Sequence, residues 1–142
     1  MHNIRKAIRE AARWALDESS RFTGFEHLPS WEETINSDAL PVRGAFILAE
    51  NFARTTLGGE HQRDIKLTIV AKRQGGRDID DELDEDLEQI VGLISQALNG
   101  AVICAANVQC TAEAGQTQIS ADGGKRVGTV AVTFNCRCYW IF

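Results

Sequence analysis

The amino-acid sequence predicts an α+β domain with two layers, in which two main helices pack on one face of a four-stranded, mostly antiparallel or mixed sheet. Three observations predict this fold. Segments near 4–17 and 79–98 place apolar residues at the spacing of a helix, whereas segments near 65–72 and 127–140 alternate like strands. The predicted elements follow one another as a helix, two strands, a helix and two strands. A chain of 142 residues fits a single domain, 1–142.

The first helix is predicted to run for roughly four turns from its first apolar residue. Its apolar side chains recur at helical spacing, as Ile4, Ile8, Ala11, Ala15 and Leu16. We expect it to end in the polar segment 17–20, where side chains compete for backbone hydrogen bonds. Residues 21–40 show no sustained period, so we expect an ordered connection with a short helical turn near 32–35.

Two strands joined by a long antiparallel hairpin are predicted next. The first spans 42–52 and follows Pro41, which can start a strand but cannot occupy its middle. The second spans 65–72, where alternate residues indicate one buried face and one wetter face. The connection between them is 53–63. We expect its loop, 54–63, to be mobile in an isolated subunit and ordered in an assembly, because it contains two adjacent glycines and no apolar anchor apart from Leu57.

The second helix is the most clearly patterned element. Asp78 is a plausible N-cap, and the acidic residues after it complement the positive end of the helix dipole. Its apolar stripe comprises Ile79, Leu83, Leu87, Ile90, Val91, Ile94 and Leu98. Asn99-Gly100 is a typical helix end.

The C-terminal part predicts two further strands. Residues 101–106 are ambiguous, 107–113 favour a strand, and 114–126 predict a polar loop that contains glycine. The last strand spans 127–140. One of its faces carries Val130, Val132, Phe134, Cys136 and Cys138, opposite Thr129, Thr133, Asn135 and Arg137.

No catalytic, cofactor-binding or metal-binding motif is present, so we expect a protein that is not an enzyme and has no cofactor. Cys136 and Cys138 lie too close together for a structural zinc pair, whose members are usually separated by about two to four residues. We therefore predict reduced, metal-free cysteines. Leu83 stands where a calcium-binding loop needs glycine, and the glycine pairs lack the context of a phosphate-binding loop.

Net charge and hydropathy bear on whether the protein binds nucleic acid or a membrane. The net charge of −5 argues against a protein dedicated to binding specific nucleic-acid sequences, which needs clustered Lys and Arg. No apolar run approaches the roughly 20 residues that cross a bilayer, so no membrane partner is expected. The N-terminus lacks the pattern of a signal peptide, which favours a reducing cytoplasm, at least until assembly.

Three places resemble the tail terminator family of long-tailed phages, the minor tail protein U-like group. They are an acidic aromatic segment before a strand started by proline (Trp31-Glu32-Glu33, then 38–46), an alternating strand after a polar hairpin (64–71), and a loop leading into a helix with an acidic start (77–83). The chain also closes with a long alternating strand, so the resemblance extends over essentially its full length.

This resemblance implies a structural virion protein at the head-proximal end of the tail of a phage or gene-transfer particle, assembled in the host cytoplasm. Such a protein forms a homo-oligomeric ring, usually a hexamer, which ends polymerisation of the tail tube and presents a surface for head joining. Its partners are the tail tube protein and a head–tail connector protein, and DNA can pass through the ring. A subunit or tube interface is expected at the hairpin, at Arg54, Leu57, Gly58, Gly59, Glu60, His61 and Arg63.

Other functions remain open from the residues alone. The chain is alternatively a different head–tail connector or completion protein, or a small ligand-binding α+β domain or enzyme without a recognisable motif. The cationic residues of the first helix, Arg5, Arg9 and Arg13, are opposite in sign to the acidic start of the second, Asp80, Asp81, Asp84 and Glu85. These residues predict either a contact between neighbouring subunits or two separate solvated faces.

Overall fold

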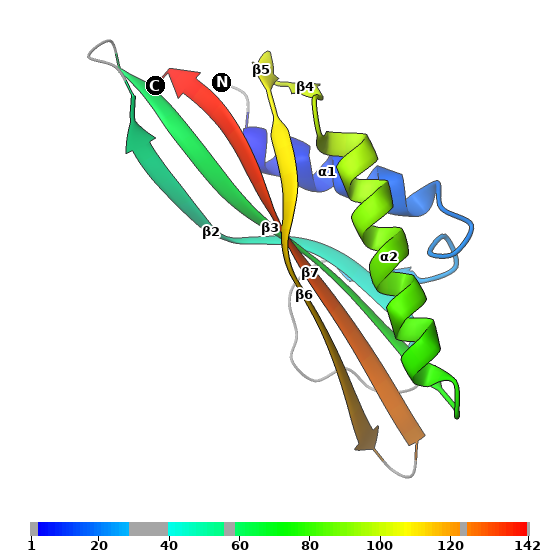
Figure 1. The fold of residues 1–142 in the computed structure, drawn as a ribbon. Coiled ribbons are helices and arrows are strands. Elements are labelled where there is room, and N and C mark those ends of the chain that lie inside the picture. The colour runs from blue at the N-terminus through cyan, green and yellow to red at the C-terminus, as the bar shows by residue number, and fades with distance from the viewer. Residues whose placement is uncertain (1–2, 29–39, 56–58, 123–124, 142) are drawn as a thin grey trace.

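The computed structural model describes residues 3–28, 40–55, 59–122 and 125–141. It contains two long helices, α1 (Ile4–Asp17) and α2 (Ile79–Leu98), which lie together on one side of a twisted sheet (Figure 1). The strands are β1 (Glu26–His27), β2 (Val42–Arg54), β3 (Glu60–Gly75), β4 (Val102–Ile103), β5 (Ala106–Asn107), β6 (Gln109–Asp122) and β7 (Lys125–Ile141). The predicted α+β class with both helices on one face is confirmed, and the predicted helical turn at 32–35 lies outside the described residues.

The main sheet has five strands, so the predicted number of four is wrong. Its order is β1-β2-β3-β7-β6, and β4 and β5 form a separate small sheet. All neighbours in the main sheet are antiparallel except β1, which pairs with β2 in parallel over two residues. The fifth strand is β1, a segment too short to give a sequence pattern. The sheet is therefore mixed, as one of the two predicted versions stated.

Two predicted loops are largely strand. The polar segment 114–126 belongs to the hairpin of β6 and β7, whose ladder reaches Asp122 and Lys125. The segment 53–63 is likewise strand at both ends, because Arg54 pairs with His61. In β6 every residue from 111 to 121 is exposed, so no burial imposes an alternating pattern there. Its backbone hydrogen bonds to β7 hold the strand without an apolar face.

Both helix predictions are confirmed almost to the residue. The side chain of Asn3 accepts a hydrogen bond from the backbone of Lys6 at 3.1 Å, which caps α1. The first turn of α2 contains three acidic residues, although the side chain of Asp78 makes no capping hydrogen bond. Gly100 adopts a φ of +81° just after α2, where a side chain would be strained. None of the described helices is long and apolar enough to span a membrane.

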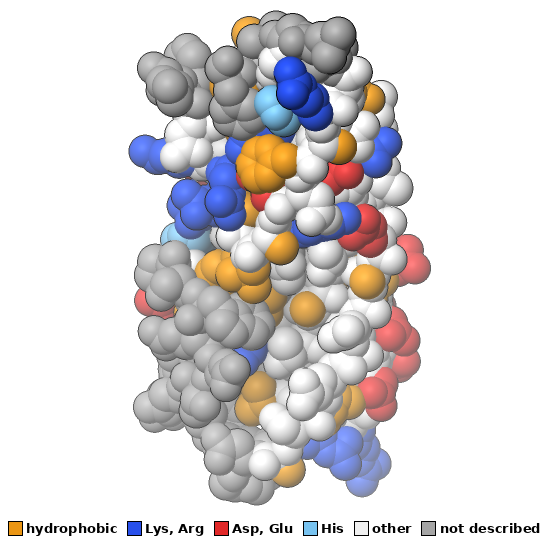
Figure 2. Space-filling view, turned by 90° about the vertical axis from the view of Figure 1, so that its left-hand side faces the viewer, with side chains coloured by type: hydrophobic (Ala, Val, Ile, Leu, Met, Phe, Trp, Pro, Cys, Tyr) orange, Lys and Arg blue, Asp and Glu red, His pale blue; other side chains and the backbone are white. Residues whose placement is uncertain are grey.

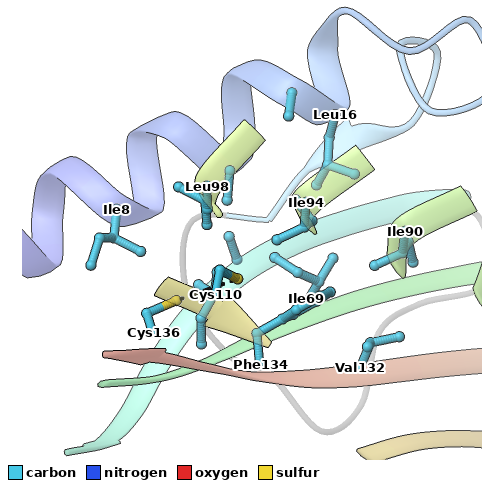
Figure 3. Close-up of a cluster of buried hydrophobic side chains, with 14 of the residues drawn as sticks. Ile8, Leu16, Ile69, Ile90, Ile94, Leu98, Cys110, Val132, Phe134 and Cys136 are labelled. Carbon is cyan, nitrogen blue, oxygen red and sulfur yellow. Dashed lines mark hydrogen bonds between the residues drawn. The ribbon is translucent and has the colours of Figure 1, made fainter. Parts of the chain in front are cut away.

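The core lies between the helices and the sheet, and Figure 3 shows its centre. Ile8 and Leu16 from α1 and Ile90, Ile94 and Leu98 from α2 point towards Ile69, Cys110, Val132, Phe134 and Cys136 of the sheet. Two glycines let α2 approach closely. A Cβ atom at Gly115 would lie 2.9 Å from Leu87 Cδ1, and one at Gly128 would lie 2.8 Å from Leu83 Cδ1. These contacts place α2 across β6 and β7.

The ambiguous segment after α2 is a tight hairpin, and part of the predicted strand 107–113 contributes its second arm. Its two turn residues, Cys104 and Ala105, have φ values of 51° and 64°. Both positions of such a turn favour glycine or asparagine, because a Cβ atom crowds the backbone at positive φ.

Ala105→Gly is therefore expected to raise the free energy of unfolding by about 0.5–1 kcal/mol, through relief of left-handed strain. Chemical denaturation of the two proteins measures this difference. Ala114→Gly is the matched control in an exposed extended strand, where glycine is expected to destabilise. Equal effects of the two substitutions would contradict the strained turn.

Candidate interaction surfaces

Most of the residues predicted to form a hairpin interface lie on strands and not in a loop. Arg54 ends β2, whereas Glu60, His61 and Arg63 belong to β3. Gly59 precedes β3 with a φ of +87°, and residues 56–58, including Leu57 and Gly58, lie outside the described part of the chain. Whether these residues contact a neighbour stays a prediction. The loop boundary at 63 is wrong, because β3 begins at Glu60, five residues before the predicted start of this strand at Ile65.

Arg63 is a buried member of a charged and aromatic cluster. It is 8% exposed, and its guanidinium forms two hydrogen bonds to Glu50, one of them from Nη2 to Oε1 at 3.0 Å. Its Cζ atom lies 5.4 Å from the ring centre of Phe52 and 5.7 Å from that of Trp140. The hydrogen bonds that Arg63 donates to Glu50 raise the pKa of Arg63 above its ordinary value. A guanidinium between two aromatic rings gains from both cation–π contacts.

A bulge in β2 creates this cluster. The register between β2 and β3 shifts between Ile47 and Ala49, so Leu48 is an extra residue. Before the bulge, odd-numbered residues such as Ile47 face the helices. After it, Glu50 pairs with the buried Ile65, so Glu50 and Phe52 point to the helix side instead. Phe52 remains 55% exposed, which leaves an apolar surface near the projecting end of the β2–β3 hairpin (Figure 1).

A second buried ion-pair network joins α2 to the sheet. Asp86 is fully buried and accepts hydrogen bonds from Arg21 Nε at 2.5 Å and from Arg73 Nε at 2.7 Å and Nη2 at 2.8 Å. Arg73 Nη1 also donates to Glu82 at 2.9 Å, and Arg21 Nη1 to Glu85 at 3.1 Å. Burial lowers the pKa of Arg73, but its bonds to Asp86 and Glu82 outweigh this and raise it. Some acidic residues at the start of α2 therefore form ion pairs within the subunit.

The cysteines are free thiols. Cys110 and Cys136 lie opposite each other on β6 and β7, with their sulfur atoms 3.8 Å apart, and Cys138 is also buried. The hydrogen bond with Cys110, followed by burial, raises the pKa of Cys136, and burial raises that of Cys138. Thiols in this state are poor nucleophiles. Within the described ranges, no group of three or more His, Cys, Asp or Glu side chains is placed to hold a metal ion.

The open face of the sheet, away from the helices, is mostly polar and uncharged over β6 and β7. One hollow on this hairpin, of about 510 Å³, is lined by Gln116, Thr117, Gln118, Thr129 and Ala131, none of which is titratable. Two ion pairs lie on this face, Lys66 with Glu113 at 2.6 Å and Arg137 Nε with Asp64 at 2.8 Å. The hydrogen bond from Arg137 lowers the pKa of Asp64. Figure 2 shows this face, with charged side chains across its upper half and along its right-hand margin.

The comparisons with known proteins concern the fold alone. No protein-family model matches this chain, and no curated protein matches it. Among solved structures, it is similar to a chain of the virion of a native gene transfer agent (GTA) particle, with a TM-score of 0.58 and 12% sequence identity. The match covers 99% of this chain and 100% of that chain. The protein therefore shares its fold, along essentially its whole length, with a chain of that virion.

Proposed function

We propose that this chain is a structural virion protein that forms a homo-oligomeric ring, a hexamer, at the head-proximal end of a tail tube. There it ends polymerisation of the tube protein and presents the surface to which a head–tail connector binds. The observation that carries this proposal is the likeness in fold, without insertion of another domain, to a chain of a gene transfer agent virion. The resemblance of the sequence to tail terminators supports the finer assignment.

The surfaces of the subunit support a role in protein contacts. The buried side chains of Asp86 and Arg63 form ion pairs within the subunit. The hollow on β6 and β7 is lined by amide, hydroxyl and methyl groups and has no titratable side chain. An enzyme site usually combines a deep pocket with ionisable groups of shifted pKa. An exposed aromatic ring beside a buried arginine, as at Phe52 and Arg63, is instead typical of the centre of a protein interface.

Deletion of the gene from a particle-producing strain tests the proposal. Electron microscopy is expected to show tail tubes of uncontrolled length that are not joined to heads, and a plasmid copy of the gene is expected to restore both defects. Tubes of normal length joined to heads would contradict the proposal. Tubes of normal length beside unjoined heads would instead assign the chain to a connector role.

A further inference from the structure

One side of the subunit carries a row of cations, of which Arg9 and Arg13 have no ion pair among the described residues. Arg5, Arg9 and Arg13 follow one another at four-residue spacing, so they line one side of α1. Arg5 Nη2 donates to the carbonyl oxygen of Ile47 at 3.1 Å, so this side faces β2. Arg5 also lies 3.8 Å from Glu50. The Nε atoms of Arg9 and Arg13 are buried without a hydrogen-bond partner, and in the described parts of the chain neither residue has an ion pair.

The opposite side of the subunit carries free anions. Leu87 touches Gly115 and so marks the side of α2 that faces β6. Asp80 and Asp84 precede Leu87 by seven and three residues, which places them on the same side of the helix. Glu88 follows Asp84 at four-residue spacing. All three acids are exposed and have no ion pair with the described residues, whereas Glu85 is paired with Arg21. Asp84 and Glu88 line one surface hollow together with Arg21 and Glu85, so Asp80 is the acid that lies nearest to the Leu87 side of the helix.

The edge of the sheet beside these acids is open. β6 ends the strand order, and along 111–121 its outward backbone groups have no strand partner among the residues described. This stretch has neither the proline nor the lysine with which proteins protect such edges. Its single charge, Glu113, is paired with Lys66. A neighbouring subunit can therefore cover this edge without burying an unpaired charge.

These two sides belong to the same chain and lie at opposite margins of the sheet. In Figure 2, Asp and Glu side chains gather along the right-hand margin, and Lys and Arg side chains lie at the upper left and also at the upper and lower ends of the right-hand side. We infer that the α2–β6 side of one copy binds the α1–β2 side of the next, with Asp80, Asp84 and Glu88 facing Arg5, Arg9 and Arg13. This inference rests on the proposed homo-oligomer and names its lateral contact. Because the two sides differ, repetition of the contact generates a ring if it closes.

Charge reversal tests the contact. Two variants of the full chain are made, Arg9→Glu with Arg13→Glu, and Asp80→Lys with Asp84→Lys. Sedimentation velocity is expected to show that each variant alone associates about 100-fold more weakly than the natural chain, because like charges then face each other. An equimolar mixture of the two is expected to assemble again, since every contact in an alternating ring then joins opposite charges. One chain with all four substitutions keeps the net charge of −5 and is also expected to assemble.

The control changes the net charge without touching the contact. Glu10→Lys with Glu18→Lys alters two exposed acids, one on α1 and one at its C-cap, by the same charge as the Asp80 and Asp84 substitutions, and is expected to leave assembly unchanged. Circular dichroism checks that every variant is folded. The inference is overturned if the single-side variants assemble like the natural chain, if the mixture fails to assemble, or if the natural chain stays monomeric at about 1 mM, a concentration at which even weak contacts are populated. The gene deletion tests the proposed function independently of this contact.

Discussion

Asp86→Ala is expected to lower the free energy of unfolding by about 3–5 kcal/mol, measured by urea denaturation. Asp86 is 0% exposed and accepts hydrogen bonds from both Arg21 and Arg73. Its removal leaves the partly buried guanidinium of Arg73 with only Glu82 and the ring of Phe25, 5.1 Å away, as partners. Uncompensated buried charge is among the most costly defects in a folded protein.

Asp84→Ala is the matched control for this prediction. Asp84 lies on the same helix two residues earlier and is exposed, so its replacement is expected to change stability by no more than about 0.5 kcal/mol. A loss below about 1 kcal/mol for Asp86→Ala would contradict the buried network, because hydrogen bonds to charged groups contribute at least that much.

Phe134→Ala is expected to cost about 3–5 kcal/mol, through lost apolar burial and the cavity that remains. Phe134 is 0% exposed and lies at the centre of the core, below α1 and α2 (Figure 3). Thermal or chemical unfolding of the purified variant measures the loss. The same substitution also tests the register of β7, because successive side chains of a strand point to opposite faces.

The neighbouring residue supplies the control for that register. Thr133 faces the open side of the sheet, where its hydroxyl lies 3.4 Å from that of Thr68. Thr133→Ala is expected to cost about 1 kcal/mol or less, since it removes one partly buried hydrogen bond. A larger loss of stability for Thr133→Ala than for Phe134→Ala would contradict the pairing of Thr133 with Thr68 and would indicate a register shifted by one residue.

The elements that the sequence predicts well are those with one fully buried side. α2 was predicted within a residue at each end, because Ile79, Leu83, Ile90, Ile94 and Leu98 are all buried and an Asn-Gly pair ends the helix. The alternation of β7 predicted its core face for the same reason. β6 and the first part of β3 were predicted poorly, because the side chains of 114–121 are all exposed and those of 60–62 are all half-buried, so neither stretch alternates.

The candidate surfaces were predictable only in part. Arg63 was named as an interface residue on a mobile loop, whereas it is held on a strand between Phe52 and Trp140. The cause is the bulge at Leu48, which turns Glu50 towards the helix side. Residues 45–49 are all apolar, so the sequence shows no break in alternation there. A bulge has no fixed sequence motif, and the partner strand alone reveals the shift. The sequence shows that α1 and α2 carry opposite charges. The structure adds that Glu85 is ion-paired with Arg21 inside the subunit, whereas Asp80 and Asp84 have no ion pair among the described residues.

The exposed strand β6 has a consequence for how this protein changes during evolution. From 111 to 121 its side chains are in solvent, and its place in the sheet depends on backbone hydrogen bonds to β7. Folding therefore constrains the length of this strand and the close approach at Gly115, and it requires little of the other side chains in the segment. A strand of this kind is compatible with wide variation in sequence at an unchanged architecture. A shared fold at 12% sequence identity, as with the gene transfer agent chain, agrees with such a weak requirement.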